Sequence, residues 1–332
     1  MASSRRSGTS ENVSTYGSGG RDYTALGTWE SATDNNLVTS TTSEVLEVYD
    51  DSASYNDQVT IAGATTNSTY FRIIRAETES RPKGIKSTGA VFSSTADSDV
   101  FVISESNFKL QDVNITASIT SASTRHAVRI TSTVVDVVGV FIYDLVNSGS
   151  GAFDGIGLEA AECNIVNCII DAANLGIEST ATGGTRHDIY NCTVVNGSSI
   201  GYLHADAEFT ELAIKNCIGD NNTSFDFFVN AEGNSTNNSS SDTSSPGGSD
   251  RDSQTFTFVS ANDFHLQSGD AGAKNFGADL SSDTQFAFDD DIDFQTRPDA
   301  TTWDIGADEE GASEASASSS GLALLPMLKV GL

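Results

Sequence analysis

Positive charge is the scarcest property of this chain. Its 332 residues include 17 Lys and Arg against 46 Asp and Glu, which gives a formal net charge of −29. Phosphate backbones and anionic headgroups are bound by clusters of Lys and Arg, so nucleic acid and membrane surfaces are poor candidate partners. An acidic exterior instead keeps an exposed protein dispersed, and its carboxylates are potential ligands for divalent cations.

Long apolar runs are also missing. The most apolar segment, residues 322–332, is too short to span a bilayer and contains Pro326. No apolar stretch follows Arg5 and Arg6 near the N-terminus, which argues against a cleaved secretory signal. We therefore expect a protein that is used in a cytoplasm, or is assembled there into a virion that is later released. The alternative location is extracellular, on a cell surface.

Proline and cysteine are rare, with four of each. The cysteines form no CxxC pair and have no His pair at zinc-ligand spacing, so we interpret them as buried free thiols that act as small apolar residues. Few prolines, 29 glycines and many Ser, Thr, Asn and Asp residues favour short strands joined by tight turns. The four cysteines are Cys163, Cys168, Cys192 and Cys217.

A repeat of about two dozen residues runs through the middle of the chain. Each copy has an apolar residue, a variable residue, Asn or Asp, and then Cys or an aliphatic residue, and a second motif of Gly and aliphatic residues lies between copies. The longer first interval implies an insertion. The polar members are Asp112, Asp144, Asn167, Asn191 and Asn216, and the second motif covers 155–158, 175–177, 200–203 and 225–229.

This repeat predicts an all-β fold, a single-stranded right-handed parallel β-helix. Two short strands per repeat cannot bury an apolar face alone, but coils stacked about 4.8 Å apart share one interior, and their Asn and Cys side chains form ladders. An antiparallel sandwich gives no reason for Asn-Cys at a fixed interval, and helical repeats have a 3.6-residue period. Strict alternation gives one face to Ile165, Asn167 and Ile169 and the other to Val166, Cys168 and Ile170.

Three segments near the C-terminal end carry a family resemblance. Residues 263–272 are DFHLQSGDAG, residues 291–298 are DIDFQTRP, and residues 303–309 are WDIGADE. They resemble, in order, the DFHLQPGSPA, DIDGxxRP and DIGAYE motifs of right-handed β-helix repeat proteins of the pectate-lyase-like superfamily. The resemblance implies the fold and leaves function open, because the family spans enzymes, adhesins, surface proteins and phage tail components. The chain departs from the motifs at Asp270, Phe294 and Asp308.

Composition divides the chain into four parts. We expect residues 1–20 to be a flexible arm, 21–309 to be the β-helix domain with caps at both ends, and 310–321 to be a flexible linker. The apolar tail from Leu322 to Leu332 is predicted either to dock to a partner subunit or to fold back onto the final coil.

Within the domain, the spacing of Tyr23, Leu26 and Trp29 predicts a short helix, N-capped by Asp22, that covers the open end of the solenoid. The polar stretch 231–255 is expected to be a long surface loop. The first strands are expected at 45–49, 58–61, 70–75 and 100–104.

The sequence shows no catalytic constellation, and we assign no catalytic residue. The histidines have no partners at motif spacing, so we interpret them as solvated turn residues or simple hydrogen-bonding residues. Outward coil positions are mostly Ser, Thr, Asn and Tyr, without the ring of Asp and Arg expected of a lyase groove, and there is no phosphate loop or nucleophile elbow. The histidines are His126, His187, His204 and His265.

Clustered carboxylates at 289–293 suggest a Ca²⁺ site, but they lack the Gly and distal Glu of an EF-hand loop. We interpret them instead as an ion pair between Asp293 and Arg297 that shapes a turn, with the other carboxylates solvated, and we assign no metal or cofactor. The roles of Asp304, Asp308 and Glu309 stay open between the same two interpretations.

Three functional hypotheses follow. The one that the sequence favours is a structural or adhesive protein exposed on a virus particle, such as a tail fibre, spike, head decoration or appendage subunit, with other subunits as partners and trimers as a common form. The second is a polysaccharide lyase or glycoside hydrolase, which would carry three or more carboxylates and an Arg along one sheet. The third is a non-catalytic adhesin that binds host glycans through exposed aromatic rings.

Overall fold

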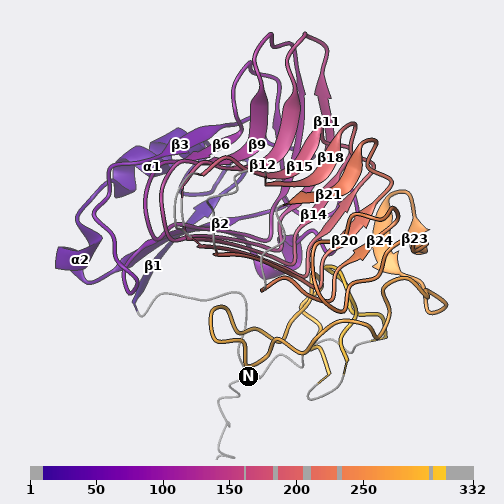
Figure 1. The fold of residues 1–332 in the computed structure, drawn as a ribbon. Coiled ribbons are helices and arrows are strands. Elements are labelled where there is room, and N and C mark those ends of the chain that lie inside the picture. Colours follow the sequence, from indigo (N-terminus) through magenta and orange to yellow (C-terminus); the bar gives the residue numbers. More distant parts are fainter. Residues whose placement is uncertain are drawn as a thin grey trace, which may run out of the picture.

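The chain winds into a right-handed parallel β-helix, as the repeat predicted (Figure 1). Three sheets run along its length, and every strand pair within them is parallel. We number them sheets I, II and III in the order in which a coil passes through them. The structure, a computed structural model, describes residues 10–160, 162–181, 186–204, 211–229, 234–298 and 302–311.

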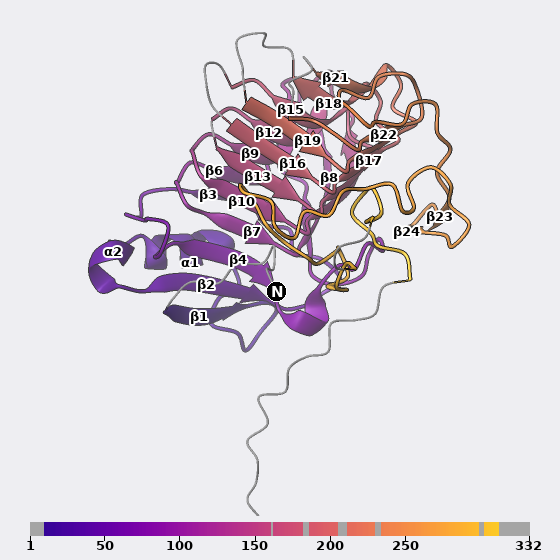
Figure 2. The same ribbon diagram turned by 60° about the horizontal axis from the view of Figure 1, so that its bottom comes forward.

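The strands of the three sheets follow one another coil by coil (Figure 2). Sheet I contains β1 (Glu11–Tyr16), β2 (Ser43–Val48), β4 (Arg72–Ala76), β7 (Lys109–Gln111), β10 (Val135–Val138), β13 (Cys163–Val166), β16 (Arg186–Tyr190) and β19 (Glu211–Lys215). Sheet II contains β5 (Val91–Ser94), β8 (Asn114–Ile119), β11 (Phe141–Asn147), β14 (Ile169–Asp171), β17 (Thr193–Val195), β20 (Ile218–Asp220) and β22 (Ser239–Ser240). Sheet III contains β3 (Val59–Ile61), β6 (Phe101–Ile103), β9 (Arg125–Ile130), β12 (Phe153–Leu158), β15 (Leu175–Ser179), β18 (Ile200–His204) and β21 (Phe225–Val229).

From Asp112 on, each coil turns from sheet I into sheet II through one residue in the left-handed region. Asn167, Asn191 and Asn216 hold φ angles of 52°, 50° and 54°, which Asn tolerates better than most residues. Asn216 Nδ2 donates a hydrogen bond to Asn191 Oδ1 at 3.2 Å, and the backbone N–H of each of the three donates to the following coil. The predicted column of Asn residues is confirmed, but the amide pairing joins only Asn216 and Asn191, because Asn167 Nδ2 donates to the carbonyl of Asp290.

The assignment of Asp144 to this ladder was wrong. Asp112 and Gly139 occupy the equivalent corners, with φ of 55° and 64°, and both donate their backbone N–H to the next coil. Asp144 lies in β11, where the pairing with β8 shifts register between Ile142 and Leu145. The long first interval therefore arises because Asp144 lies beyond the true corner at Gly139, and it does not mark an insertion in the ladder.

The left-handed corner also resets the alternation of side chains. Ile165, Cys168 and Ile170 all face the interior, whereas Val166 and Ile169 face outward and are covered by other side chains. The alternation predicted across the corner was wrong, because a single left-handed residue separates two short strands that lie in different sheets. Alternation holds only within each strand.

The cysteines are buried free thiols, as predicted. Those that follow the ladder Asn residues stack at the corner, where the N–H of Cys192 donates to Sγ of Cys217 at 3.5 Å. Burial raises the pKa of Cys163 to about 12, so its thiol stays protonated and packs as a small apolar group.

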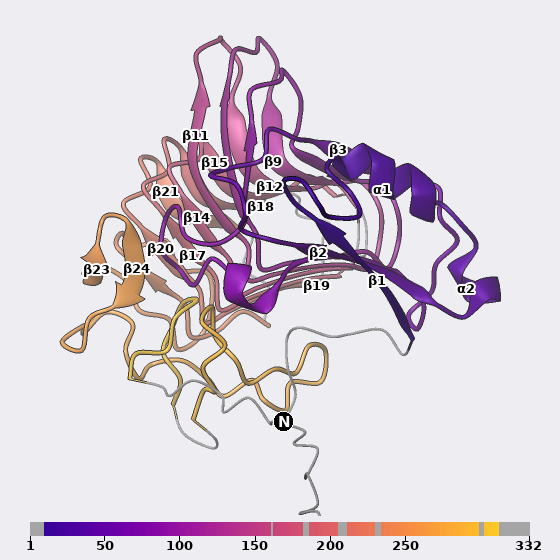
Figure 3. The ribbon, with the colours of Figure 1, turned by 180° about the vertical axis from the view of Figure 1, so that it is seen from behind.

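A helix covers the first coil, as predicted. In α1 (Leu26–Thr33), Leu26 and Trp29 are fully buried, and the helix lies beside β3, the terminal strand of sheet III (Figure 3). The residue before the helix is Ala25 and not Asp22, whose carboxylate accepts hydrogen bonds from the backbone and hydroxyl of Thr15. Short helices α2 (Leu37–Ser40) and η1 (Thr78–Ser80) lie in the first connections.

Residues 1–20 do not form an arm over their whole length. Residues 11–16 are β1, which pairs with β2 and gives sheet I its first strand. An unpaired β2 would leave an open strand edge, and β1 satisfies its backbone groups. Residues 1–9 lie outside the described part of the chain. The strands predicted at 45–49, 58–61, 70–75 and 100–104 correspond to β2, β3, β4 and β6.

Residues 234–255 continue the stack and are not the predicted surface loop. Thr236 bridges Lys215 on one side and Gly248 on the other, and β22 pairs with β20. Asn238 is fully buried, where its side chain donates to the carbonyl of Ile214 and accepts from the N–H of Cys217. Hydroxyl and amide side chains thus close the last coil by pairing with backbone groups that a strand edge would expose.

Residues 256–298 and 302–311, which we call the C-terminal segment, fold back along the outside of sheets I and II (Figure 2). Phe288 and Trp303 pack on Val138 and Val166 of sheet I, and the hairpin of β23 (Phe258–Ser260) and β24 (Asp263–Leu266) packs on sheet II through Phe264. Sheet III contributes no residue to these contacts within the described part of the chain, so its outer face stays uncovered by this segment. No helix among the described residues is long and apolar enough to cross a membrane.

Candidate functional site

Strands β9, β12 and β15 lie side by side in sheet III (Figure 1). The candidate site is a hollow on their outer face. We call it the acidic hollow. The connections before β9 and β12, which contain Thr124 and Ala152, line one side of it. The remaining lining residues are His126, Asp154, Gly157, Glu159, Asn174, Leu175, Glu178 and Thr180.

Three strands bring one imidazole and two carboxylates together in this hollow. His126 Nε2 lies 3.9 Å from Asp154 Oδ2 and 3.8 Å from Glu178 Oε2, and the three atoms all lie within 4.8 Å of one another. His126 is 9% exposed and Asp154 is 1% exposed, while the Glu178 side chain is 20% exposed at the mouth. The stacking of coils therefore joins residues that are far apart in the sequence.

The position of each side chain has a local cause. A Cβ at Gly157 would lie 2.6 Å from His126 Cδ2, so the absence of a side chain at Gly157 makes room for the ring. Asp154 Oδ1 accepts hydrogen bonds from Asn174 Nδ2 at 2.8 Å and from the N–H of Leu175 at 2.9 Å, which leaves Oδ2 toward the ring. Behind the ring, Asp99 Oδ1 lies 3.5 Å from His126 Nδ1.

The ionisable groups of the hollow shift one another's pKa values. Burial opposes a charge on His126, but Asp99, Glu178 and Asp154 outweigh it and raise the pKa of the imidazole to about 9. Burial raises the pKa of Asp154 despite its hydrogen bonds. Burial also works against ionisation of Asp99, but its contacts with His126 and the charge of Arg129 lower the pKa of this carboxyl.

Arginines complete this face of the sheet. Arg129 donates to both carboxylate oxygens of Glu159 at 2.7 and 2.9 Å, and its Nη1 lies 3.7 Å from Asp99. Arg125 pairs with Asp97 at 2.9 Å beside a neighbouring hollow. Several carboxylates and Arg therefore do lie along one sheet, contrary to the expectation from the sequence.

The sequence did not reveal this cluster, because it does not show which residues of neighbouring coils lie opposite one another. His126 was assigned to a turn, whereas it lies in β9 opposite Asp154. Glu178 lies opposite Gly157, one coil further on. The only signal in the sequence was the short run of Arg125, His126 and Arg129, which becomes informative once the coil boundaries are known.

The same face ends in an exposed apolar area, which we call the apolar end. Leu175 of the hollow is in register with Ile200 and then Phe225, and Glu178 is in register with Leu203 and then Phe228. Phe225 and Phe228 are 45% and 47% exposed, and their ring centroids lie 5.5 Å apart. The second sequence motif thus forms neighbouring strands of sheet III, as expected, and its last copy presents two aromatic rings.

The other histidines serve the structure. His187 and His204 are buried in β16 and β18 and are not solvated turn residues. His187 accepts a hydrogen bond from the N–H of Cys163 at 3.4 Å, and burial together with His204 lowers its pKa to about 3. His265 contacts Asp263 through Nδ1 and Asp293 through Nε2, the latter at 2.6 Å.

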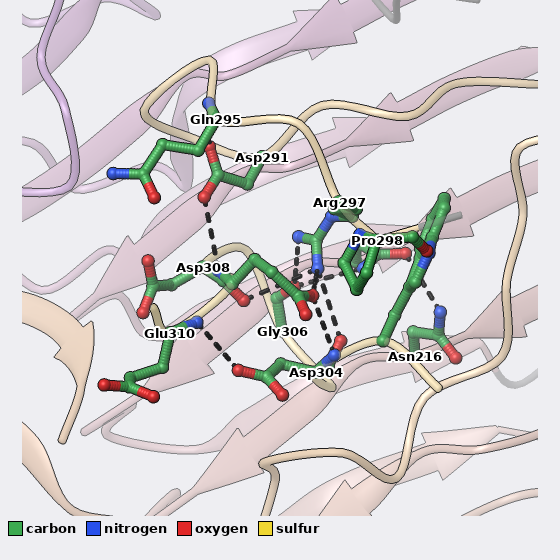
Figure 4. A network of polar contacts seen from close by, with 12 residues as sticks. Asn216, Asp291, Gln295, Arg297, Pro298, Asp304, Gly306, Asp308 and Glu310 are labelled. Carbon is green, nitrogen blue, oxygen red and sulfur yellow. Dashed lines mark hydrogen bonds and ion pairs between the residues drawn. The ribbon is translucent and has the colours of Figure 1, made fainter. Parts of the chain in front are cut away.

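The predicted ion pair between Asp293 and Arg297 does not form. Arg297 is fully buried and instead pairs with Glu309 at 2.9 Å, and its guanidinium donates to the carbonyls of Gly306 and Ala307 (Figure 4). Arg297 therefore ties the second resemblance motif to the third.

The acidic residues of these motifs mainly hold backbone turns. Asp291 is buried and accepts from the N–H groups of Asp293, Gln295 and Glu309. Three further carboxylates accept backbone N–H groups in the same way. They are Asp304, from Asn275 and Glu310; Asp308, from Leu266; and Asp270, from Thr257, Gly272 and Ala273.

The departure at Phe294 preserves the turn. Its φ is 69°, the left-handed conformation that the usual Gly adopts freely, and the Arg81 guanidinium lies 3.6 Å from the centre of its ring. This cation–π contact offsets part of the cost of a side chain at positive φ.

The chain was compared with family models, curated proteins and solved structures. No protein-family model matches the chain, and no curated protein matches it. A solved structure of the pectate lyase Pel9A is similar, with a TM-score of 0.40 and 13% sequence identity over 92% of this chain and 98% of that one.

Proposed function

We propose that this chain is a structural and adhesive β-helix exposed on a virus particle or a cell, and that it binds glycans along the outer face of sheet III. One observation carries the proposal. The C-terminal segment packs on sheets I and II, while the outer face of sheet III presents the acidic hollow and, next to it, the exposed rings of Phe225 and Phe228.

The dimensions of this face suit an oligosaccharide. The apolar end begins two strands beyond β15, about 10 Å from the hollow at the spacing of parallel strands. Exposed aromatic rings offer flat apolar surfaces to the carbon-bound hydrogens of a sugar ring, and the carboxylates and Asn174 of the hollow offer partners to its hydroxyls. Contiguous apolar surface bordered by polar groups is typical of ligand-binding grooves.

The charge of the face favours neutral glycans. Asp154, Glu178 and Glu159 line the hollow, and the guanidinium of Arg129 is held by Glu159. A uronic acid or sialic acid would meet like charges there, and the net charge of the chain adds to the repulsion.

The structural part of the proposal is supported by the way the coils are joined. Each coil is hydrogen-bonded to its neighbours along three sheets, which makes a stiff body suited to a spike, fibre or decoration. The tail 322–332, expected to dock to a partner subunit, lies outside the described residues, and trimerisation and virion assembly remain part of the proposal. Immunogold electron microscopy of purified particles tests the location.

Glycan binding is tested on an array of neutral and acidic glycans, followed by calorimetry with the best ligand. The double variant Phe225→Ala/Phe228→Ala should lose at least 10-fold in affinity, because it removes both stacking surfaces. Phe276→Ala is the matched control, since Phe276 is 40% exposed but lies in the C-terminal segment. Silence of the array, or equal affinity of both variants and the parent protein, would refute the proposal.

A second candidate function is glycoside cleavage at the acidic hollow. Asp154 and Glu178 have carboxylate oxygens no more than 4.8 Å apart, which excludes the separation of about 6.5–9.5 Å found in inverting glycosidases and leaves the retaining mechanism. Burial raises the pKa of Asp154, as suits a general acid. Reducing ends released from a neutral polysaccharide panel, and lost in Asp154→Asn, would establish cleavage, whereas binding without release would leave an adhesin.

A further inference from the structure

We propose that His126, Asp154 and Glu178 form a site for one divalent first-row transition-metal ion, such as Zn²⁺. The inference concerns the acidic hollow but does not rest on glycan binding, since the ion alone is the ligand.

The three donor atoms lie slightly further apart than ligands around a shared ion. An ion bound at about 2.1 Å by each atom holds its ligand atoms roughly 3.4 Å apart in a tetrahedral arrangement. Nε2 of His126 lies 3.9 and 3.8 Å from the two carboxylate oxygens, too far for hydrogen bonds and within a small side-chain adjustment of that arrangement. The three groups thus converge on one point without bonding to each other.

The unsatisfied polarity of the histidine is a second, independent observation. His126 is nine-tenths buried, yet its Nδ1 has no hydrogen-bond partner and its Nε2 faces the two carboxylates beyond hydrogen-bonding distance. Three carboxylates surround the ring, but none lies within hydrogen-bonding distance of either nitrogen, and a buried polar group without a hydrogen bond is costly. A metal ion on Nε2 would supply that partner and leave Nδ1 to donate toward Asp99.

The surroundings are arranged as the outer shell of such a site. Asp99 Oδ1 lies 3.5 Å behind Nδ1, where a carboxylate fixes the orientation and tautomer of a ligating histidine. Asn174 and the N–H of Leu175 hold the other oxygen of Asp154, and Gly157 leaves space for the ring. His126 and Asp154 are therefore held by their environment, while Glu178 lies at the exposed mouth of the hollow and completes the site from there.

The donor set selects the class of ion. One imidazole nitrogen and two carboxylates suit Zn²⁺ and its neighbours in the first row, whereas Ca²⁺ and Mg²⁺ prefer oxygen ligands only. The other His and carboxylate cluster in the described residues, around His265, differs because both of its ring nitrogens already contact carboxylates. That cluster serves as an internal control.

The test is calorimetric titration of the untagged full chain with ZnCl₂, after chelator treatment, in 150 mM NaCl (about physiological ionic strength) with excess Mg²⁺ to occupy weak surface sites. Absorption spectra of the Co²⁺-loaded protein report the ligand geometry. We expect one saturable equivalent, with tetrahedral Co²⁺ bands. His126→Ala and Glu178→Gln should each weaken binding by about 100-fold or more, since the loss of an outer-shell partner alone costs about 10- to 100-fold, and His265→Gln should leave it unchanged.

Three results would overturn the site: no saturable Zn²⁺ binding, binding that His126→Ala and Glu178→Gln leave intact, or Co²⁺ spectra with the charge-transfer bands of thiolate ligands. Circular dichroism checks that each variant is folded, and Glu178→Gln, at the exposed mouth, keeps the test valid if His126→Ala is not. Glycan binding is measured separately with Phe225→Ala/Phe228→Ala, so failure of one proposal is distinguishable from failure of the other.

Discussion

Asn191 illustrates how a single residue both shapes a coil and ties it to its neighbours. Its backbone holds a left-handed conformation at the corner between β16 and β17, its Oδ1 accepts from Asn216, and its Nδ2 donates to the carbonyl of Gly306 at 3.3 Å. The last contact lies in the C-terminal segment. The repeated Asn is therefore a corner residue, a ladder member and an anchor for the segment that covers the corner.

Two substitutions separate these roles. Asn191→Ala should lower the free energy of unfolding by about 2–4 kcal/mol, because it combines a left-handed backbone cost with lost buried hydrogen bonds. Asn191→Gly should lose about 1 kcal/mol less, since Gly adopts positive φ freely, as Gly139 does in the same column. Urea unfolding measures both. Equal losses would show that backbone conformation contributes little at this corner.

The limits of the sequence also show at this scale. The spacing of Asn167, Asn191 and Asn216 predicted their stacking, because equal intervals in a solenoid place equal residues above one another. The sequence did not show that the Asn is a corner, so the alternation carried through it failed. Nor did it separate Asp144, at a bulge, from Gly139, the true member of the column. Both failures concern the backbone conformation of the corner, which requires a positive φ. Gly139 adopts it because Gly has no side chain, and Asp112 because its short polar side chain tolerates it.

At the scale of elements, the two ends of the stack are closed in different ways. Helix α1 covers the first coil with apolar side chains, and its spacing was visible in Leu26 and Trp29. The last coil is closed by residues 234–255, whose Ser and Asn side chains bond to backbone groups of the coil before them. Low hydrophobicity predicted a loop there because apolar patterning cannot reveal ladders of hydroxyl and amide groups.

The C-terminal segment is an element whose stability should depend on pH. Burial raises the pKa of Asp308 to about 6 despite His265, and raises that of Glu309 to about 7 despite Arg297. Burial opposes a charge on His265, but Asp293, Asp308 and Asp263 outweigh it and raise its pKa to about 10. All three groups bind protons more tightly when folded. Their contribution to the stability of the segment is full below the pKa values of the unfolded chain. It is lost as the pH rises through the pKa values of the folded protein.

We therefore expect the segment to become less stable from pH 5 to pH 8, with a further loss toward pH 10. Hydrogen exchange of residues 256–298 measures this locally, once rates are corrected for the intrinsic effect of pH. Asp308→Asn should flatten the dependence near pH 6, because an amide still accepts the N–H of Leu266 without titrating. A segment that becomes more stable between pH 5 and pH 8 would contradict these pKa shifts.

At the scale of the whole molecule, the arrangement of covered and uncovered faces decides where ligands can bind. The C-terminal segment uses Phe288, Trp303 and Phe264 to cover sheets I and II, and sheet III keeps its outer face. The sequence predicted a cap at this end of the domain. It could not predict the free face, because that depends on which sheets the segment crosses, or the hollow, because that depends on the register of His126 with Asp154.

The central claim is that ligands meet this protein on the outer face of sheet III. A crystal structure of the full chain with a bound neutral oligosaccharide, chosen from the glycan array, tests it most directly. We expect a sugar ring stacked on Phe225 or Phe228, with the chain running toward Glu178. A glycan bound to residues 256–311, or anywhere away from sheet III, would contradict the claim.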